Sequence, residues 1–444
     1  MDAGDRRRNA RFDVRRVRFL GSVSAREGSG EVSALNQLRE TLQSVLQLKP
    51  IEWNPVRRRL ARAVSVDDMR RMSKRRLPRG VFDYIDGGAE DERTLRANCE
   101  AFASVKFRPR VLRGVADIDV SGQILGAKTS FPFVMAPTGF TRIADPQGEL
   151  AVARAAQRAG VPYTLSTLAT RSIEEVRRAA PLARLWFQVY AWRDRALVAD
   201  MVRRAAAADY EALVLTVDTA VFGRRERDLR RGFSLPPKIG PGTFVDGLAH
   251  PEWTISFLRS EPIRFANVIG AEVGDGSSPV DLAGYINSQF ESGLSWSDVE
   301  WLRSLWSGPI IIKGIQSVDD ARIAADVGVE AIALSNHGGR QLDDSPAIFP
   351  LVAPVADAVA GKLEIICDGG VRRGSDIVKA VAAGATACMG GRAYLYALGA
   401  AGEAGVDQLL TTWSEDIRRT LALVGVSSFD ELDRSFLDGL TDAG

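Results

Sequence analysis

Short apolar runs alternate along the chain with segments of helix length. The runs cover residues 133–136, 163–166, 185–190, 212–218, 310–313, 331–335, 364–368 and 387–391. Between most of them lie segments rich in Ala, Arg and Glu, such as residues 148–159, 173–179 and 318–327. Alternating strands and helices predict a parallel sheet that is buried on both faces. Eight such units predict an α/β fold, a closed (β/α)8 TIM barrel, within residues 51–444.

The alternation breaks after the fourth predicted strand, where residues 237–296 precede the next helix. This insertion is rich in Gly, Pro and aromatic residues. A connection of this length is usually a lid, a binding segment or disordered. One hypothesis is that Trp253, Phe257 and Phe265 rest on a membrane surface, with Arg259 and Arg264 near the lipid headgroups. A lid or a subunit contact is an equal alternative.

Residues 1–50 differ in composition from the rest of the chain. Their first part is crowded with Arg6, Arg7, Arg8, Arg11, Arg15, Arg16 and Arg18. No apolar stretch follows these arginines, so a secretory signal peptide is not expected. We expect a disordered basic N-terminal extension, in which residues 33–48 could form a short amphipathic helix. Attachment to a membrane surface and a wrongly assigned start codon are the alternatives.

The composition is that of an ordinary globular enzyme. The 444 residues are 45% hydrophobic and 26% charged, and the formal net charge of +2 gives no reason to expect nucleic acid as a partner. No run approaches the ~20 apolar residues of a membrane span. Cys99, Cys367 and Cys388 are far apart, which favours buried thiols in a reducing compartment. His250 and His337 are the only histidines, and no metal site is predicted.

Polar residues recur where each predicted strand ends, which is where the active sites of such barrels lie. These ends carry Pro137-Thr138-Gly139, Ser166-Thr167, Gln188-Val189-Tyr190, Thr216-Val217-Asp218, Lys313, residues 335–340, Asp368-Gly369-Gly370 and Gly391-Arg392. The glycine-rich turns after the last two strands, with Arg372 and Arg392, predict a phosphate site. No Gly-x-Gly-x-x-Gly follows a strand and opens a helix, which argues against a dinucleotide fold.

One block of nine residues resembles the hallmark of the FMN-dependent 2-hydroxy acid oxidases and dehydrogenases. It reads Ser335-Asn336-His337-Gly338-Gly339-Arg340-Gln341-Leu342-Asp343. That family includes glycolate oxidase, lactate oxidase, mandelate dehydrogenase and quinone-linked L-lactate dehydrogenase. The resemblance covers roughly residues 60–435, with further matches at 82–84, 88–92, 136–138, 187–190, 216–218, 223–225 and 313–314. The insertion, with residues 247–251, most resembles the bacterial quinone-linked L-lactate dehydrogenases.

His337 is the predicted base for the substrate proton. An imidazole suits this role because its unperturbed pKa of ~6.5 lies near working pH. The resemblance implies that Asp218 orients His337 and stabilises its protonated form.

Arg340 is the predicted clamp for the substrate carboxylate, because a guanidinium group can bind a carboxylate at two points. Arg225 is the second candidate. The resemblance implies that Tyr84 and Tyr190 hydrogen-bond the substrate, and core packing is the alternative for either tyrosine.

The resemblance implies FMN as the cofactor. Lys313 would stand beside flavin N1, where negative charge develops on reduction. The other expected flavin contacts are Ser166, Gln188, Thr216 and Ser335, together with the backbone of Pro137, Thr138 and Gly139. The expected phosphate contacts are Asp368, Gly369, Gly370, Arg372, Gly391 and Arg392.

Three positions depart from the family pattern. Gly139 stands where the oxidases often have alanine, and glycine there is common in members that pass electrons to quinone or cytochrome. Leu168 stands where glycolate oxidase has tryptophan, which leaves the substrate size open. Ala220 stands where proline is usual, and we attach no function to it.

The sequence therefore predicts FMN-dependent oxidation of a small L-2-hydroxy acid, with L-lactate the first choice and quinone or another electron acceptor. The alternatives are an oxidase that uses oxygen, or oxidation of an aromatic or peptide-derived hydroxy or amino substrate. Two further interpretations are disfavoured. An FMN barrel isomerase would not need a carboxylate clamp, and a flavin-binding scaffold without activity would not need a residue at every catalytic position. By resemblance we expect a homotetramer. We expect it in the cytoplasm, and attachment to the inner face of the cell membrane is the alternative.

Overall fold

The computed structural model describes residues 36–37, 39–42, 44, 52–231, 240–268, 289 and 293–440. Eight parallel strands close into a barrel in the order β10-β11-β4-β5-β6-β7-β8-β9. Their bounds are β4 Phe133–Met135, β5 Tyr163–Leu165, β6 Leu185–Val189, β7 Ala212–Thr216, β8 Ile310–Ile315, β9 Ala331–Ser335, β10 Glu364–Asp368 and β11 Ala387–Gly390. Each predicted apolar run coincides with one barrel strand, although β8 extends two residues beyond its predicted run 310–313, so the predicted (β/α)8 fold is confirmed.

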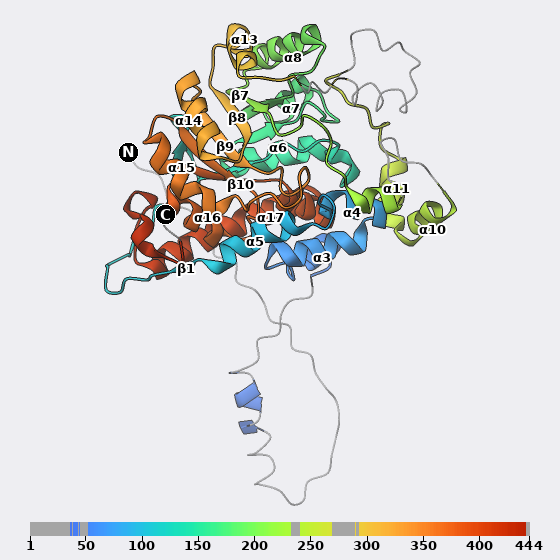
Figure 1. Cartoon of the computed structure of the whole chain (residues 1–444). Helices are drawn as coiled ribbons and strands as arrows, with labels where there is room; N and C mark the ends of the chain where they lie inside the picture. The colour runs from blue at the N-terminus through green and yellow to red at the C-terminus, as the bar shows by residue number, and fades with distance from the viewer. Residues whose placement is uncertain are drawn as a thin grey trace, which may run out of the picture. The chain divides into compact units, whose positions relative to one another are not determined.

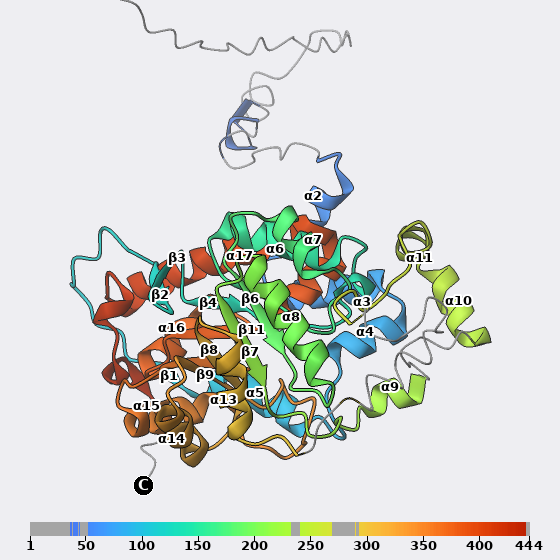
Figure 2. The ribbon, with the colours of Figure 1, turned by 90° about the horizontal axis from the view of Figure 1, so that it is seen from above.

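Helices surround the strands and cover the outer face of the barrel (Figure 2). They are α6 Gly148–Ala159, α7 Ile173–Ala179, α8 Arg195–Ala207, α13 Ser297–Leu305, α14 Val318–Val327, α15 Val352–Val359, α16 Gly374–Ala383 and α17 Arg392–Val424. Ser172 begins α7 with a capping box that it forms with Glu175, and the side chain of Ser317 caps α14. Gly160 and Gly328 end α6 and α14 in the left-handed region.

The strands are buried on both sides, which explains why they read as continuous apolar runs. Inside the barrel, Trp186, Val214, Ile311, Ile366 and Met389 belong to one buried cluster. Side chains on the outer face of the strands pack against the helices in the main core. Because side chains fill the barrel interior, a ligand site must lie at one end of the barrel.

Further elements precede and follow the barrel strands in the sequence. Before them lie α2 Pro55–Leu60, α3 Val66–Arg76, α4 Arg79–Asp86 and α5 Arg93–Ser104. Strand β1 Lys106–Phe107 pairs with β12 Leu437–Asp438, and β2 Gly122–Ile124 forms a hairpin with β3 Ala127–Thr129. Short 3-10 turns are η1 Thr141–Ile143, η2 Phe349–Leu351, η3 Phe429–Glu431 and η4 Arg434–Phe436. Ile124 of the hairpin joins the cluster inside the barrel.

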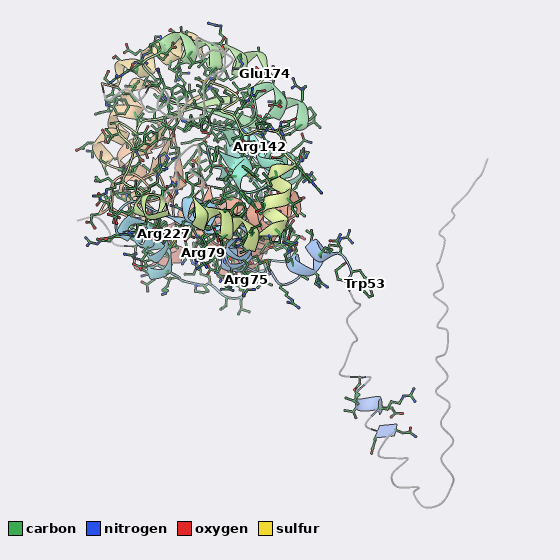
Figure 3. All side chains as sticks on the ribbon, turned by 90° about the vertical axis from the view of Figure 1, so that its right-hand side faces the viewer. Trp53, Arg75, Arg79, Arg142, Glu174 and Arg227 are labelled. Carbon is green, nitrogen blue, oxygen red and sulfur yellow. The ribbon has the colours of Figure 1, made fainter. Side chains whose placement is uncertain are left out.

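The connection after β7 contains helices in its described part, namely α9 Glu226–Arg231, α10 Pro241–Ala249 and α11 Pro251–Leu258. Figure 1 shows α10 and α11 together at the edge of the barrel unit. A hydrogen bond and an ion pair connect them to the helices that precede the barrel. Asp246 of α10 accepts from the backbone N–H of Arg79 at 2.6 Å, and Glu252 of α11 pairs with Arg76 at 3.2 Å. Figure 3 labels Arg79 on this side of the molecule.

Phe265 and Trp253, which the sequence suggests for membrane contact, pack against the protein instead. Phe265 is only 8% exposed, and its ring lies 5.8 Å from that of Phe140, so it cannot rest on a membrane. Trp253 donates its indole N–H to the Ile143 carbonyl at 2.8 Å and stacks on Phe257. The apolar side chains that α10 and α11 do expose are Phe244, Val245, Leu248, Ile255 and Leu258. An apolar surface therefore exists on these helices, but other residues form it.

Residues 1–53 form a unit separate from the barrel unit of residues 54–444. Most of the predicted basic extension lies outside the described residues. Residues 36–37, 39–42 and 44 are helical, and they lie within residues 33–48, the segment whose sequence is compatible with an amphipathic helix. In the part of the chain that the structure describes, no helix is long and apolar enough to cross a membrane.

Candidate active site

A cavity of about 540 Å³ opens at the C-terminal end of the barrel strands. Of the predicted site residues, the following line it: Tyr84, Pro137, Thr138, Gly139, Ser166, Gln188, Tyr190, Thr216, Arg225, Lys313, His337, Arg340, Asp368, Gly369, Gly370, Arg372, Gly391 and Arg392. The other two, Asp218 and Ser335, hydrogen-bond residues of the cavity wall. The fold therefore brings all the predicted site residues to one end of the barrel.

His337 follows β9 and is held next to a buried carboxylate. Its Nδ1 lies 3.0 Å from Oδ1 of Asp218, whose side chain is only 3% exposed. Burial lowers the pKa of His337 below its ordinary value, and Asp218 opposes that shift. Burial acts to raise the pKa of Asp218, but His337 and Lys313 outweigh it, so this pKa is lowered. At neutral pH the pair is therefore a neutral imidazole beside an ionised carboxylate.

Arg340 and Arg225 are two of the arginines that line the cavity together with His337. Arg340 Nη1 donates to the backbone carbonyls of Tyr84 and Gly87, each at 2.9 Å. Burial, with Arg225 and Arg392 nearby, lowers the pKa of Arg340 to about 9, so this group is still a cation at neutral pH. Among the described residues, the buried Nε of Arg225 has no hydrogen-bond partner. This part of the cavity is therefore suited to an anion.

The ammonium group of Lys313 is buried and paired. Its Nζ lies 3.0 Å from Oδ2 of Asp368 and donates to Ser335 Oγ at 2.9 Å. The Ser335 hydroxyl in turn donates to Asp368 Oδ2 at 2.8 Å. Burial acts to lower the pKa of Lys313, but Asp368 and Asp218 more than offset it, so this pKa is raised. Lys313 is therefore a cation in the cavity wall at neutral pH. The Ser335 hydroxyl already donates its proton to Asp368.

Besides Arg225 Nε, three buried polar atoms of the wall lack a hydrogen-bond partner among the described residues, namely Gln188 Nε2, Thr216 Oγ1 and Arg392 Nε. The other side-chain atom of Gln188, Oε1, accepts from Ser166 Oγ at 3.1 Å and from Thr167 N at 3.2 Å. Because leaving a buried polar atom unpaired is unfavourable, Gln188 and Thr216 indicate a ligand with complementary polar groups.

Glycine turns follow the last two barrel strands. Gly369 and Gly370 have φ values of 133° and 84°, which favour glycine over residues with a side chain. They precede α16, and α17 begins at Arg392, whose guanidinium group donates to the Gly338 carbonyl at 2.8 Å. Arg372 lines the same cavity. Helix N-termini and arginines together suit a phosphate group.

The two predicted substrate tyrosines reach the cavity from different elements, Tyr84 from α4 and Tyr190 from the loop after β6. Tyr190 is 9% exposed, and burial raises its pKa, so its phenol is protonated at neutral pH. The ring of Tyr84 meets Phe140 edge-on at 6.4 Å. Tyr190 can therefore donate a hydrogen bond to a ligand.

The sequence and the fold both have counterparts among known proteins. Residues 73–439 match the family model described as FMN-dependent dehydrogenase. The chain belongs to the FMN-dependent dehydrogenase family.

Relatives within this family carry different names. A protein of Mycobacterium tuberculosis that is provisionally named L-lactate dehydrogenase is 44% identical over 391 residues, which are 88% of this chain and 93% of that protein. Glycolate oxidase 1 of Oryza sativa is 42% identical over 85% of this chain and 96% of its own length. A crystal structure described as the monotopic membrane protein (S)-mandelate dehydrogenase has a TM-score of 0.82 and 38% identity, over 85% of this chain and 99% of that one.

As a family member, the protein is an FMN-dependent oxidoreductase that acts on a CH–OH group. The cavity fits this cofactor. The unpartnered atoms of Gln188 and Thr216 and the cation of Lys313 suit the polar edge of a flavin ring. The glycine turns with Arg372 and Arg392 suit its single phosphate.

Asp228, in the cavity wall, and Asn98, behind it, were not predicted from the sequence. Asp228 of α9 lines the cavity and interacts electrostatically with Arg340 and Arg225, and burial raises its pKa. Its position three residues after Arg225, in the first turn of the helix that begins at Glu226, was an available signal. Asn98 of α5 hydrogen-bonds Asn336 in the loop that carries His337. No local pattern could have indicated this contact, because 238 residues separate the two partners.

Proposed function

We propose that the enzyme oxidises a small L-2-hydroxy acid to the 2-oxo acid, with L-lactate as the first candidate, and passes the electrons to a quinone. The observation that carries this proposal is the His337–Asp218 pair in contact with a cavity that also holds Arg340 and Arg225. A base and a two-point carboxylate site in one cavity suit a substrate with a hydroxyl group next to a carboxylate.

In the proposed reaction, Arg340 and Arg225 bind the substrate carboxylate, and Tyr84 and Tyr190 hydrogen-bond the substrate. His337 takes one proton from the substrate, and the ionised Asp218 stabilises the resulting imidazolium.

FMN, when bound, would accept the two electrons and the second hydrogen that the substrate loses. Lys313 supplies a fixed positive charge in the wall, which favours negative charge on a nearby ring. Gln188, Thr216 and Ser166 would bind the edge of that ring, and Ser335 would act through Lys313 rather than by direct contact.

The names of relatives support L-lactate, but one observation favours an aromatic substrate as a second candidate. Tyr84, Leu168 and Phe265 line the cavity, and Phe140 packs against both aromatic rings. Such a wall suits the phenyl group of a mandelate-like acid. Anaerobic rates of flavin reduction by L-lactate, glycolate, (S)-mandelate and D-lactate would rank the candidates. Faster reduction by (S)-mandelate than by L-lactate would replace the first candidate by the second, and equal rates with D-lactate would contradict L-selectivity.

A quinone acceptor is supported by Gly139 in the cavity wall and by the exposed apolar side chains of Phe222 and Leu229, which also line the cavity. The test is to reduce the enzyme anaerobically and to compare the rates of its reoxidation by a soluble quinone and by oxygen. Faster reoxidation by oxygen at equal concentration would indicate an oxidase.

We further propose that the apolar side chains of α10 and α11 rest on the membrane surface where quinones reside. Phe244, Val245 and Leu248 are 62%, 64% and 64% exposed, and Leu258 is 75% exposed. The monotopic membrane description of the related mandelate dehydrogenase supports this role. A contact between subunits is the alternative.

The membrane role can be tested by co-sedimentation with anionic liposomes. The double variant Leu248→Asp/Leu258→Asp should no longer sediment with them. The control is Leu182→Asp, because Leu182 is 84% exposed but lies outside these helices. Sedimentation of the double variant with liposomes as in the wild type would contradict the membrane role. A change in its oligomeric state without loss of liposome binding would instead identify a subunit contact.

A further inference from the structure

The loop that carries His337 has an unusual backbone. His337, Gly338 and Gly339 have φ values of 57°, 63° and 72°, so three consecutive residues are in the left-handed region. Glycine adopts this conformation readily, but a residue with a side chain does so at a cost in free energy. Contacts with the rest of the protein must therefore hold His337 in this conformation.

A pair of buried asparagine side chains supplies such a contact. Asn98 Nδ2 donates to Asn336 Oδ1 at 2.8 Å, and Asn336 Nδ2 donates to Asn98 Oδ1 at 3.0 Å. Each side chain belongs to a residue that is only 1% exposed. Asn336 Oδ1 also accepts from the backbone N–H of Gly339 at 3.1 Å, and Asn98 Oδ1 accepts from that of Ile348 at 3.2 Å. The amide pair thus contacts both ends of the loop that runs from Asn336 to Ile348.

The backbone of Asn98 also contacts one of the glycine turns. A Cβ on Gly370 would lie 2.1 Å from the Asn98 carbonyl oxygen, so only glycine fits against α5 at this point. The N-terminus of α5 is attached to the same loop as the amide pair, because Asp343 accepts from the backbone N–H of Thr94 at 2.9 Å. Helix α5, labelled in Figure 1, therefore contacts both the loop with the base and the turn suited to phosphate.

We propose that Asn98 is a positioning residue for the oxidation. Through Asn336 it holds the left-handed turn that presents His337 to the substrate, and it does not itself touch the cavity. The proposal rests on the role as base assigned to His337 under the proposed function.

The amide group is essential to this role, and an isosteric substitution tests it. In Asn98→Asp, the carboxylate can only accept, so its oxygen would face Asn336 Oδ1. If the Asn336 amide turned over instead, its NH2 group would face the backbone N–H of Gly339. Either arrangement breaks a hydrogen bond that holds the turn.

Arg340 should be less affected than His337 by this change. Its guanidinium group is held separately by the carbonyls of Tyr84 and Gly87. Loss of the amide pair should therefore slow the chemical step while the affinity for the 2-oxo acid product is largely retained.

The experiment compares Asn98→Asp and Asn98→Ala with Phe102→Leu, each as the FMN-loaded enzyme. Phe102 is the matched control, because it is 2% exposed on the same helix, and its side chain stacks on Phe349 and cannot hydrogen-bond Asn336. The rate constant of anaerobic flavin reduction should fall about 10- to 100-fold in both Asn98 variants but not in the control. The Kd of the 2-oxo acid should change by less than about threefold in all three variants.

Amide hydrogen exchange of the segment 336–343 gives a readout that does not depend on activity. Exchange should be faster than in the wild type in the Asn98 variants and unchanged in Phe102→Leu. The double variant Asn98→Ala/Asn336→Ala should reduce its flavin no more slowly than the slower of the two single variants, because both residues act through one contact. Reduction and exchange that match those of the Phe102→Leu control would overturn the proposal. If His337→Gln reduces its flavin normally, the proposed function fails, whatever the Asn98 variants do.

Discussion

Replacing Asp218 by asparagine removes one negative charge from the side chain that holds His337. The asparagine has nearly the same shape, so it can still accept a hydrogen bond from His337 Nδ1 at the 3.0 Å seen here. What it loses is the attraction between a carboxylate and the imidazolium that forms when His337 accepts the substrate proton. We predict that Asp218→Asn slows flavin reduction and also shifts its pH dependence.

The size of the effect follows from the geometry. Two unit charges 3.0 Å apart attract each other by ~5–6 kcal/mol at an effective dielectric constant of ~20, which is an upper bound. A charge-assisted hydrogen bond contributes a net ~1.5–3 kcal/mol, and this range applies instead of the Coulomb bound because a neutral hydrogen bond is retained. Since each 1.36 kcal/mol is a factor of ten in rate, flavin reduction should slow about 10- to 150-fold.

The pH dependence gives a second, independent sign. His337 must be neutral to act as base, so the rate falls as the pH drops through its pKa. Burial lowers that pKa and Asp218 raises it. Removing the carboxylate therefore moves the acidic limb of the rate profile to lower pH, while the plateau rate also falls.

The assay is anaerobic stopped-flow reduction of the bound flavin between pH 5 and 9. Glu149→Gln is the control, because Glu149 is a fully buried carboxyl that hydrogen-bonds Thr170, with no contact to His337. A plateau rate within about twofold of the wild type in Asp218→Asn, or an acidic limb that moves to higher pH, would show that Asp218 does not stabilise the imidazolium of His337.

Three further predictions test other parts of the cavity. Arg340→Lys should raise KM about 10- to 100-fold, because lysine cannot bind a carboxylate at two points; an unchanged KM and kcat in steady-state assays would count against the clamp. Lys313→Met should lower the two-electron potential of the flavin by about 30–65 mV, which corresponds to losing ~1.5–3 kcal/mol of charge stabilisation, and an unshifted potential in a redox titration would remove that role. Gly139→Ala alone should not speed reoxidation by oxygen, because a Cβ at position 139 would lie 3.0 Å from the Leu168 Cβ. Gly139→Ala/Leu168→Ala, which removes that contact, should speed it, and equal reoxidation rates of the two variants would contradict this prediction.

The barrel could be predicted closely because its strands are short apolar runs buried on both faces. Residues 331–335 and 364–368 were predicted with the bounds of β9 and β10, and residues 148–159 with those of α6. The polar residues at the strand ends were predictable for a related reason. A closed barrel brings the C-terminal ends of all eight strands together. The residues at each strand end could therefore be assigned to the site without knowing how the strands are ordered.

Contacts between distant segments could not be predicted in this way. Phe265 appears in the sequence as one aromatic residue among several, and only the fold shows that it packs on Phe140. Ser335 ends a strand as expected, yet its hydroxyl is committed to Lys313 and Asp368. Asn98 lies on a helix before the barrel, and its role depends on a loop far along the chain. Periodicity reports which face of an element is buried, but not which partner covers it.

The central claim is that a 2-hydroxy acid reduces the bound FMN with His337 as base. Its most direct test is to mix the holoenzyme anaerobically with excess L-lactate and to record the visible flavin absorbance, beside His337→Gln that has been shown to retain FMN. We predict rapid and complete bleaching in the wild type, with one pyruvate formed per flavin, and a variant that stays yellow. Bleaching of the variant at the rate of the wild type, or a wild type that no 2-hydroxy acid bleaches, would contradict it.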